Sequence, residues 1–156
     1  MKKIFIVALC LAPYAILACV PVDRKPVAAV TEFDAHNFDV SVKGQLASDC
    51  GLPNTNDRLK WESSKGDALD KVAACITTGE LKDRKIRVKA FTDARGTVGY
   101  NKTLGKVRAD AVADYLISKG VPADHIYKTT HGENLAAGDN NNEYQGDRHV
   151  DVEIYN

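Results

Sequence analysis

The stretch TDARGTVGYNKTLGKVRADAVADYL, residues 92–116, decides the fold of this sequence. It follows residues 86–91, IRVKAF, in which apolar side chains alternate with basic ones. This alternation predicts a half-buried strand. Residues 100–119 then carry apolar side chains at helical spacing, and Gly120 and Pro122 directly after them are typical of a helix end. The sequence therefore predicts a strand, a glycine-containing loop and a helix in immediate succession.

The same patterns predict further elements on both sides of this unit. They are a short strand at 59–61, an amphipathic helix at 67–78, and strands at 126–130 and 149–155, with a Gly- and Asn-rich loop at 132–147. Residues 38–42, FDVSV, are ambiguous, although their alternation would suit a short strand. The order β-α-β-α-β-β predicts an α+β sandwich, with helices packed on one face of a mixed four-stranded sheet.

One basic residue interrupts the apolar stripe of the helix at 100–119. Counted in helical steps from Leu104, the core-facing positions are all apolar or amphipathic except Arg108. An arginine there needs a carboxylate, or it lies at the rim of a pocket that receives one. The alternative is that its aliphatic stem packs against the core while the guanidinium reaches water.

The loop before that helix places an acid close to the same region. Asp93 follows the strand, and Gly96 and Gly99 allow the backbone to turn tightly. A carboxylate at a strand end, beside a helix amino terminus rich in backbone donors, makes a place for small charged groups. The alternative is that Asp93 only caps the turn.

The amino terminus has the features of a lipoprotein signal. Two lysines precede an apolar run that ends at Ala18, which predicts a secretory signal peptide over residues 1–18. Residues 16–19, ILAC, look like a lipobox, so we expect Cys19 to carry a palmitate-containing lipid anchor. Val20, in place of aspartate, favours the outer membrane. The alternative is a secreted protein cut near Ala18. Residues 19–48 would then be a tether and extension, and residues 49–156 the domain.

Four cysteines are present, at positions 10, 19, 50 and 75. If Cys10 leaves with the signal peptide and Cys19 takes lipid, Cys50 and Cys75 remain. An even number in an oxidising compartment suggests one disulfide. A zinc site is the alternative, but no histidine pair lies near these cysteines.

The charge balance argues against one class of partner. The chain has a formal net charge of zero, and loss of Lys2 and Lys3 with the signal peptide would leave about −2. A basic footprint for nucleic acid is therefore missing from the sequence.

From about Leu59 to the end, the chain resembles the OmpA-like peptidoglycan-binding family, which includes the peptidoglycan-associated lipoproteins. The resemblance rests on residues 92–116, on GVPADHI at 120–126 and on DRHVDVEI at 147–154. It implies that Asp93 and Arg108 recognise diaminopimelate of the wall peptide, the aspartate taking its ammonium and the arginine its carboxylate in a bidentate fork.

The resemblance also implies the rest of the site and its setting. The further residues assigned to the site are Thr92, Gly96, Asn101, Leu104 and Arg148, with Trp61 and Glu62 in place of the family's first-strand phenylalanine–aspartate pair. The expected partners are peptidoglycan, the outer membrane through the lipid anchor, and other envelope proteins. The expected role is to tether that membrane to the wall from the periplasmic side. No cofactor or metal is implied.

The sequence departs from the family pattern at two places near this site. Ala90 and Phe91 stand where the family often has Gly-His, and His149 stands where a second arginine usually follows Arg148. These changes concern the outer contacts of the expected site, because Asp93 and Arg108 keep the family's spacing.

Two other function classes compete with wall binding. A wall hydrolase would use one of the four histidines, such as His131, as a base, but no nucleophile motif and no paired metal ligands accompany them. An adaptor of a trans-envelope complex could use the acidic, Asn-rich residues 138–147 as its surface. An ordinary solvated loop is the simpler interpretation of that segment.

Overall fold

The computed structural model describes residues 29–53 and 58–155. The predicted signal peptide and Cys19 lie outside these residues. The helices are α1 Glu32–His36, α2 Gly44–Asp49, α3 Trp61–Ser64, α4 Ala68–Thr77, α5 Val98–Ser118, the 3-10 helix η1 Ala123–His125, and α6 Asn141–Asp147. The strands are β1 Asp39–Val42, β2 Leu59–Lys60, β3 Ile86–Phe91, β4 Ile126–Gly132 and β5 His149–Ile154.

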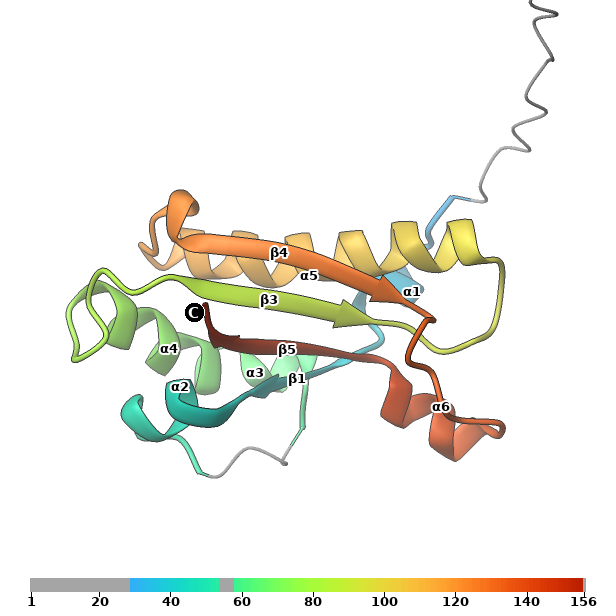
Figure 1. The fold of residues 1–156 in the computed structure, drawn as a ribbon, viewed down its shortest axis with the longest axis horizontal. Coiled ribbons are helices and arrows are strands. Elements are labelled where there is room, and N and C mark those ends of the chain that lie inside the picture. Colours follow the sequence, from blue (N-terminus) through green and yellow to red (C-terminus); the bar gives the residue numbers. More distant parts are fainter. Residues whose placement is uncertain (1–28, 54–57, 156) are drawn as a thin grey trace, which may run out of the picture.

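The strands form one mixed sheet in the order β2-β1-β5-β3-β4 (Figure 1). β1 and β5 are parallel, as are β3 and β4, whereas β3–β5 and β1–β2 are antiparallel. A mixed sheet was expected, but the prediction of four strands was wrong, because the sheet has five. The ambiguous segment at 38–42 supplies β1, which pairs with β5, and the strand predicted at 59–61 is only the short β2 beside it.

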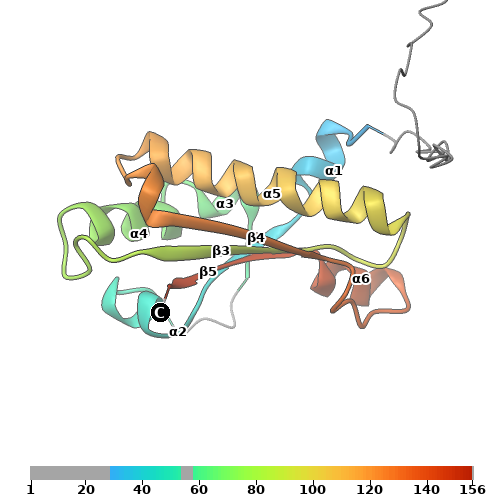
Figure 2. The same ribbon diagram turned by 45° about the horizontal axis from the view of Figure 1, so that its top comes forward.

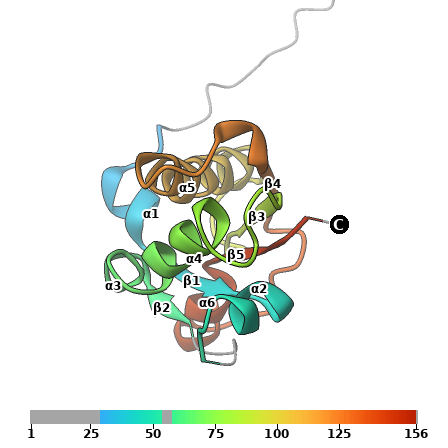
Figure 3. The same cartoon turned by 90° about the vertical axis from the view of Figure 1, so that its left-hand side faces the viewer.

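The register places the apolar residues of neighbouring strands on one face. Val88 lies opposite Val152, which in turn pairs with Val42 of β1. All three side chains are buried, while the intervening Arg87 and Glu153 form an ion pair on the other face. α4 and α5 lie on the same side of β3 and β5 (Figures 2 and 3) and close the core. The predicted packing of these two helices against one face therefore follows from the alternation of the strands.

A glycine sets how closely α5 approaches the edge strand β4. A Cβ built at Gly105 would come within 2.0 Å of Thr130 Oγ1, which no real side chain tolerates. The small residue lets the helix lie directly on β3 and β4, so the loop at 92–97 is held between two packed elements.

Two element boundaries differ from prediction for local reasons. α5 starts at Val98 rather than residue 100, because the Thr97 hydroxyl accepts a hydrogen bond from Tyr100 N at 3.2 Å and caps the first turn. The predicted loop at 132–147 contains α6, whose first turn is capped in the same way by the Asn140 side chain. Both caps are short-range contacts that hydrophobic periodicity does not report.

The segment assigned to tether and extension contributes to the packed body. α1, β1 and α2 lie in residues 32–49, and they bury Ala35, Phe38 and Leu46. The body therefore begins upstream of residue 49. No described helix combines the length and the apolar character that a membrane span requires.

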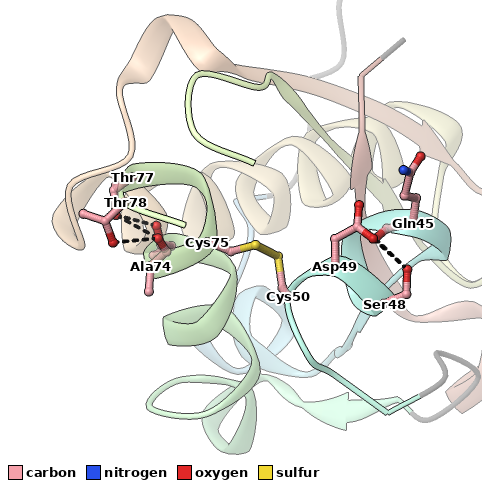
Figure 4. Close-up of a disulfide and its surroundings, with 9 residues drawn as sticks. Gln45, Ser48, Asp49, Cys50, Ala74, Cys75, Thr77 and Thr78 are labelled. Carbon is pink, nitrogen blue, oxygen red and sulfur yellow. Dashed lines mark hydrogen bonds between the residues drawn. A yellow bond between two sulfur atoms is a disulfide. The ribbon is translucent and has the colours of Figure 1, made fainter. Parts of the chain in front are cut away.

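Cys50, after α2, and Cys75, in α4, form a disulfide, which is the pairing that the sequence suggests (Figure 4). Their Cα atoms are 5.5 Å apart, and 25 positions separate them in the chain. Cys75 is buried against the core, so the disulfide fixes the end of α2 to α4, which packs against the sheet.

We expect the double variant Cys50→Ala/Cys75→Ala to lose about 3 kcal/mol of unfolding free energy, because the cross-link restricts the unfolded chain. Urea unfolding followed by circular dichroism measures the loss. The parent protein in reducing buffer should match the variant, and an unchanged unfolding midpoint in both would contradict the expectation.

Candidate functional site

Residues of α1, the loop after β3, the first half of α5 and the region of α6 line a pocket of about 560 Å³. These elements lie together at one end of the molecule (Figure 1). The lining of the pocket consists of Phe33, Asp34, Asn37, Asp93, Arg95, Gly96, Tyr100, Asn101, Leu104, Arg108, Asn141 and Arg148. Six of these are residues that the sequence assigned to the site, namely Asp93, Gly96, Asn101, Leu104, Arg108 and Arg148.

Arg108 is the largest fully buried side chain among the described residues, with 1% of its surface exposed. Its guanidinium donates to main-chain carbonyls: Nε and Nη2 to Asp34 O at 3.2 and 2.8 Å, and Nη2 to Asn37 O at 3.2 Å. Nη1 lies 3.4 Å from Phe91 O. No described carboxylate accepts a hydrogen bond from it, so the charge is solvated by backbone dipoles rather than by an ion pair.

The electrostatic setting of Arg108 is that of a cation short of counter-charge. Its pKa falls below the ordinary value of an arginine, to about 10, first because burial disfavours the charge and then because Arg148 repels it, while Asp93 and Asp34 oppose the fall. The Phe38 ring lies 5.7 Å from the guanidinium carbon and adds a weak cation–π contact. Arg108 stays protonated at neutral pH, and a carboxylate arriving in the pocket would complete its environment.

Asp93 is the buried acid of the pocket, and it is already held by two arginines. Arg148 Nη1 donates to its Oδ2 at 3.0 Å. Arg95 donates from Nη2 to Oδ2 at 2.7 Å and from Nε to Oδ1 at 3.2 Å. Burial acts to raise the pKa of Asp93, but the hydrogen bonds from Arg95 and Arg148 outweigh it, and the net shift is downward. The carboxylate is therefore ionised throughout the neutral range.

Side-chain hydrogen bonds fix the walls around this pair. Asn101 donates from Nδ2 to Arg95 O at 3.0 Å and also to the Glu133 carboxylate, which ties α5 to the loop before it and the turn after β4. The Tyr100 hydroxyl donates to the Asp34 carboxylate at 2.8 Å and holds α1 against α5. The pocket is built from segments far apart in sequence and rigidly joined.

The structure separates some of the sequence-assigned residues from the pocket. Thr92 is buried beside Asp93, where its backbone N donates to Gly132 O, but it does not line the pocket. Trp61 and Glu62 also lie outside the lining of the pocket. Trp61 begins α3 and stacks on Phe38 in the core with ring centroids 5.3 Å apart, and Glu62 points outward and pairs with Lys65. The strand that pairs with β5 is β1, and Trp61 and Glu62 do not belong to it.

Sequence reasoning missed the contribution of α1. Phe33, Asp34 and Asn37 line the pocket, and two of them supply backbone carbonyls to Arg108. A backbone carbonyl has no residue-type signature, so no pattern could have found this contact. Arg95 could have been found, since it lies two residues after Asp93 in a loop already expected to carry charge.

The two departures from the family pattern contact each other outside the pocket. Phe91 stacks on His149 with ring centroids 4.4 Å apart, and His131 covers its other face at 4.9 Å. These rings do not line the pocket, so the changes at 91 and 149 leave its lining intact.

The pocket offers fixed charges of both signs rather than metal ligands or a nucleophile. Three arginines and two aspartates line it. Among the described residues, no group of three or more His, Cys, Asp or Glu is arranged to hold a metal ion. A lining of this kind suits a small ligand that carries an ammonium and a carboxylate close together.

A model of the OmpA family matches residues 56–148, which include the loop at 92–97 and all of α5. The chain belongs to the OmpA family. The matched region leaves out α1 and β1. The α1 side of the pocket, which supplies backbone carbonyls to Arg108, therefore comes from outside the matched region.

Individual proteins also resemble part of the chain. Outer membrane protein A of Serratia marcescens is 35% identical over 109 residues, which cover 70% of this chain and 30% of that protein. Outer membrane protein A of Salmonella typhi is 42% identical over 88 residues, which cover 56% of this chain and 25% of that protein. The chain thus spans less than a third of the length of these two relatives.

Solved structures are similar to about half of the chain. The C-terminal domain of Helicobacter pylori MotB gives a TM-score of 0.50 at 22% identity, with 57% of this chain and 70% of that one covered, and shows likeness of fold. The peptidoglycan-associated lipoprotein from Burkholderia pseudomallei gives a TM-score of 0.48 at 27% identity, with 55% and 71% covered.

The lowered pKa of Asp93 predicts how stability depends on pH. Its contribution is fully present above the unfolded-state pKa of about 3.9 and is lost as pH falls through the lower pKa of the folded state. We expect Asp93→Asn to lower the unfolding free energy by about 1–3 kcal/mol at pH 7. The difference from the parent should shrink only below about pH 3.9. Urea unfolding from pH 7 to 3 tests this, and a difference that already shrinks between pH 6 and 5 would contradict it.

Proposed function

We propose that this protein binds peptidoglycan non-covalently, by holding the diaminopimelate of the stem peptide in the pocket between Asp93 and Arg108. The observation that carries the proposal is the buried Arg108, which lines the pocket without a carboxylate partner among the described residues. The free end of diaminopimelate bears an ammonium and a carboxylate on one carbon. Its carboxylate would supply the missing counter-charge, and its ammonium would meet Asp93.

The contacts of Arg108 define how the ligand would approach it. The Nε–Nη2 edge is occupied by the carbonyls of Asp34 and Asn37, so a fork made with that edge is not available. Nη1 has only the 3.4 Å contact to Phe91 O. The ligand carboxylate would therefore bind at Nη1, and backbone carbonyls would keep the guanidinium oriented for it. Arg108→Lys would fail, because an ammonium cannot satisfy the carbonyls and the ligand together.

The ligand fits the charge of the site because it is a zwitterion. An ammonium beside Asp93 and a carboxylate beside Arg108 add no net charge to a buried place. Lysine-type wall peptides end in an ammonium without the second carboxylate, so they would leave Arg108 unpaired. Recognition of this kind distinguishes the two wall types by chemistry rather than by size.

Sedimentation with purified sacculi tests the proposal. We expect Asp93→Ala, Arg108→Ala and Arg108→Lys each to weaken binding roughly ten- to a hundred-fold, the loss of a charged hydrogen bond. Free meso-diaminopimelate should compete with the sacculi for the parent protein. Nα-acetyl-lysine amide, which keeps the side-chain ammonium but has no carboxylate, should not. Sacculi with lysine-type peptides should bring down little protein.

Arg84→Ala is the matched control, since it removes an exposed arginine from the loop before β3, at the opposite end of that strand from Asp93. Circular dichroism establishes that each variant is folded. If the folded variants Asp93→Ala and Arg108→Ala co-sediment with sacculi as well as the parent does, the two residues have only a structural role. The proposed mechanism of wall binding is then contradicted.

We further propose that the protein is an outer-membrane lipoprotein anchored through Cys19, with its domain in the periplasm. The support is the lipobox-like ILAC at 16–19, together with the pairing of Cys50 with Cys75, the two cysteines that follow Cys19 in the chain. A lipid anchor at Cys19 and a wall-binding pocket in the same chain would tether the membrane to the wall.

Mass spectrometry of the protein from membranes should find a mature amino terminus at a lipid-modified Cys19. Cys19→Ser should abolish the modification and release the protein from the membrane fraction. A mature chain that begins elsewhere with an unmodified Cys19 would rule out the anchor and leave wall binding untouched.

A further inference from the structure

The two arginines on Asp93 differ in how firmly they are held. Arg148 is buried, with 9% of its surface exposed, and donates to Gln145 as well as to Asp93. The Arg95 side chain is 54% exposed and comes from the loop after β3, two residues after Asp93 in the chain. Arg148 is thus a fixed counter-charge, whereas Arg95 can leave without opening the core.

Arg95 binds the side of the Asp93 carboxylate that faces the pocket. Its Nε and Nη2 cover both carboxylate oxygens at 3.2 and 2.7 Å, and its guanidinium lines the same pocket. Its backbone N also donates to Oδ1 at 3.1 Å, a bond that does not depend on the side chain. A ligand ammonium that approaches Asp93 through the pocket therefore meets a cation already in place.

We propose that Arg95 occupies the ammonium subsite of the free protein and that the ammonium of the ligand displaces it from Asp93. This inference rests on the proposed function, since it concerns how the same pocket admits a zwitterion. The Asp93 carboxylate already accepts a hydrogen bond from Arg148. Its remaining acceptor positions cannot serve both the Arg95 guanidinium and a ligand ammonium, if each donates two or more hydrogen bonds.

The displaced guanidinium has a second place to bind. Its central carbon lies 4.9 Å from the centre of the Tyr144 ring on α6, within the range of a cation–π contact. Arg95 can therefore stay on Tyr144 at the pocket rim while its hydrogen bonds to Asp93 pass to the ligand. Because Arg95 must first be displaced, the exchange lowers the affinity for every ammonium ligand. A ligand must therefore also gain binding free energy from the contact of its carboxylate with Arg108.

The exchange predicts that removing a cation from the pocket strengthens the binding of a zwitterion. Titration calorimetry of the purified protein with meso-diaminopimelate should give an affinity about fivefold higher for Arg95→Gln than for the parent, the scale of one partly exposed ion pair. Pimelate has the same two carboxylates and no ammonium. Its affinity should not rise in Arg95→Gln, because it does not compete with Arg95 for Asp93. Arg84→Gln is the matched control and should bind both compounds as the parent does.

The outcomes separate this inference from the proposed function. If Arg95→Gln binds diaminopimelate no better than the parent, while Asp93→Ala still loses binding, Arg95 is not a competitor and only the inference fails. If pimelate gains as much as diaminopimelate, the effect is not exchange at an ammonium subsite, and the inference fails again. If the parent does not bind diaminopimelate and Asp93→Ala co-sediments with sacculi as the parent does, the proposed function fails and takes the inference with it.

Discussion

Burial of the Arg108 guanidinium is the constraint on which the rest of the structure depends. A buried cation without polar partners is far too costly for a domain of marginal stability. Here the cost is offset by carbonyls of Asp34, Asn37 and Phe91, which belong to α1, the turn after it and the end of β3. The arginine therefore joins α5 to the segment before β1 and to the end of β3. Any arrangement that released one of these segments would leave the charge unsolvated.

The same constraint explains why the pocket is continuous with the core. Asp93 is held by Arg148 at the start of β5, and Arg108 sits under Phe38, which stacks on Trp61. The charged groups of the pocket are thus neighbours of the largest apolar side chains. Their positions are set by packing, which is far less tolerant of displacement than a surface loop.

The sequence predicts the parts of this arrangement that rest on regular periods. β3 and α5 were located because alternation and helical spacing persist over many residues, and the resemblance to the OmpA-like family placed Asp93 and Arg108 at one site. β1 and α1 were not recognised as parts of the body, since four or five residues contain too few repeats of either period. The partners of Arg108 were beyond reach for a different reason. They are backbone carbonyls 71 and 74 positions away, and every residue type carries the same carbonyl.

The two halves of the site differ in rigidity, and this difference bears on how it would recognise a zwitterion. Arg108 is already desolvated and held by three carbonyls, so a carboxylate that reaches Nη1 would meet a donor that loses little further entropy. Asp93 is fixed on one side by Arg148 and covered on the other by the partly exposed Arg95. The carboxylate half is thus preorganised, while the ammonium half would work by the proposed exchange of one cation for another. Because exchange keeps the number of charges on Asp93 constant, the buried carboxylate is never left without a partner, with or without ligand. A site built in this way can remain stable when empty and still bind a ligand whose two charges arrive together.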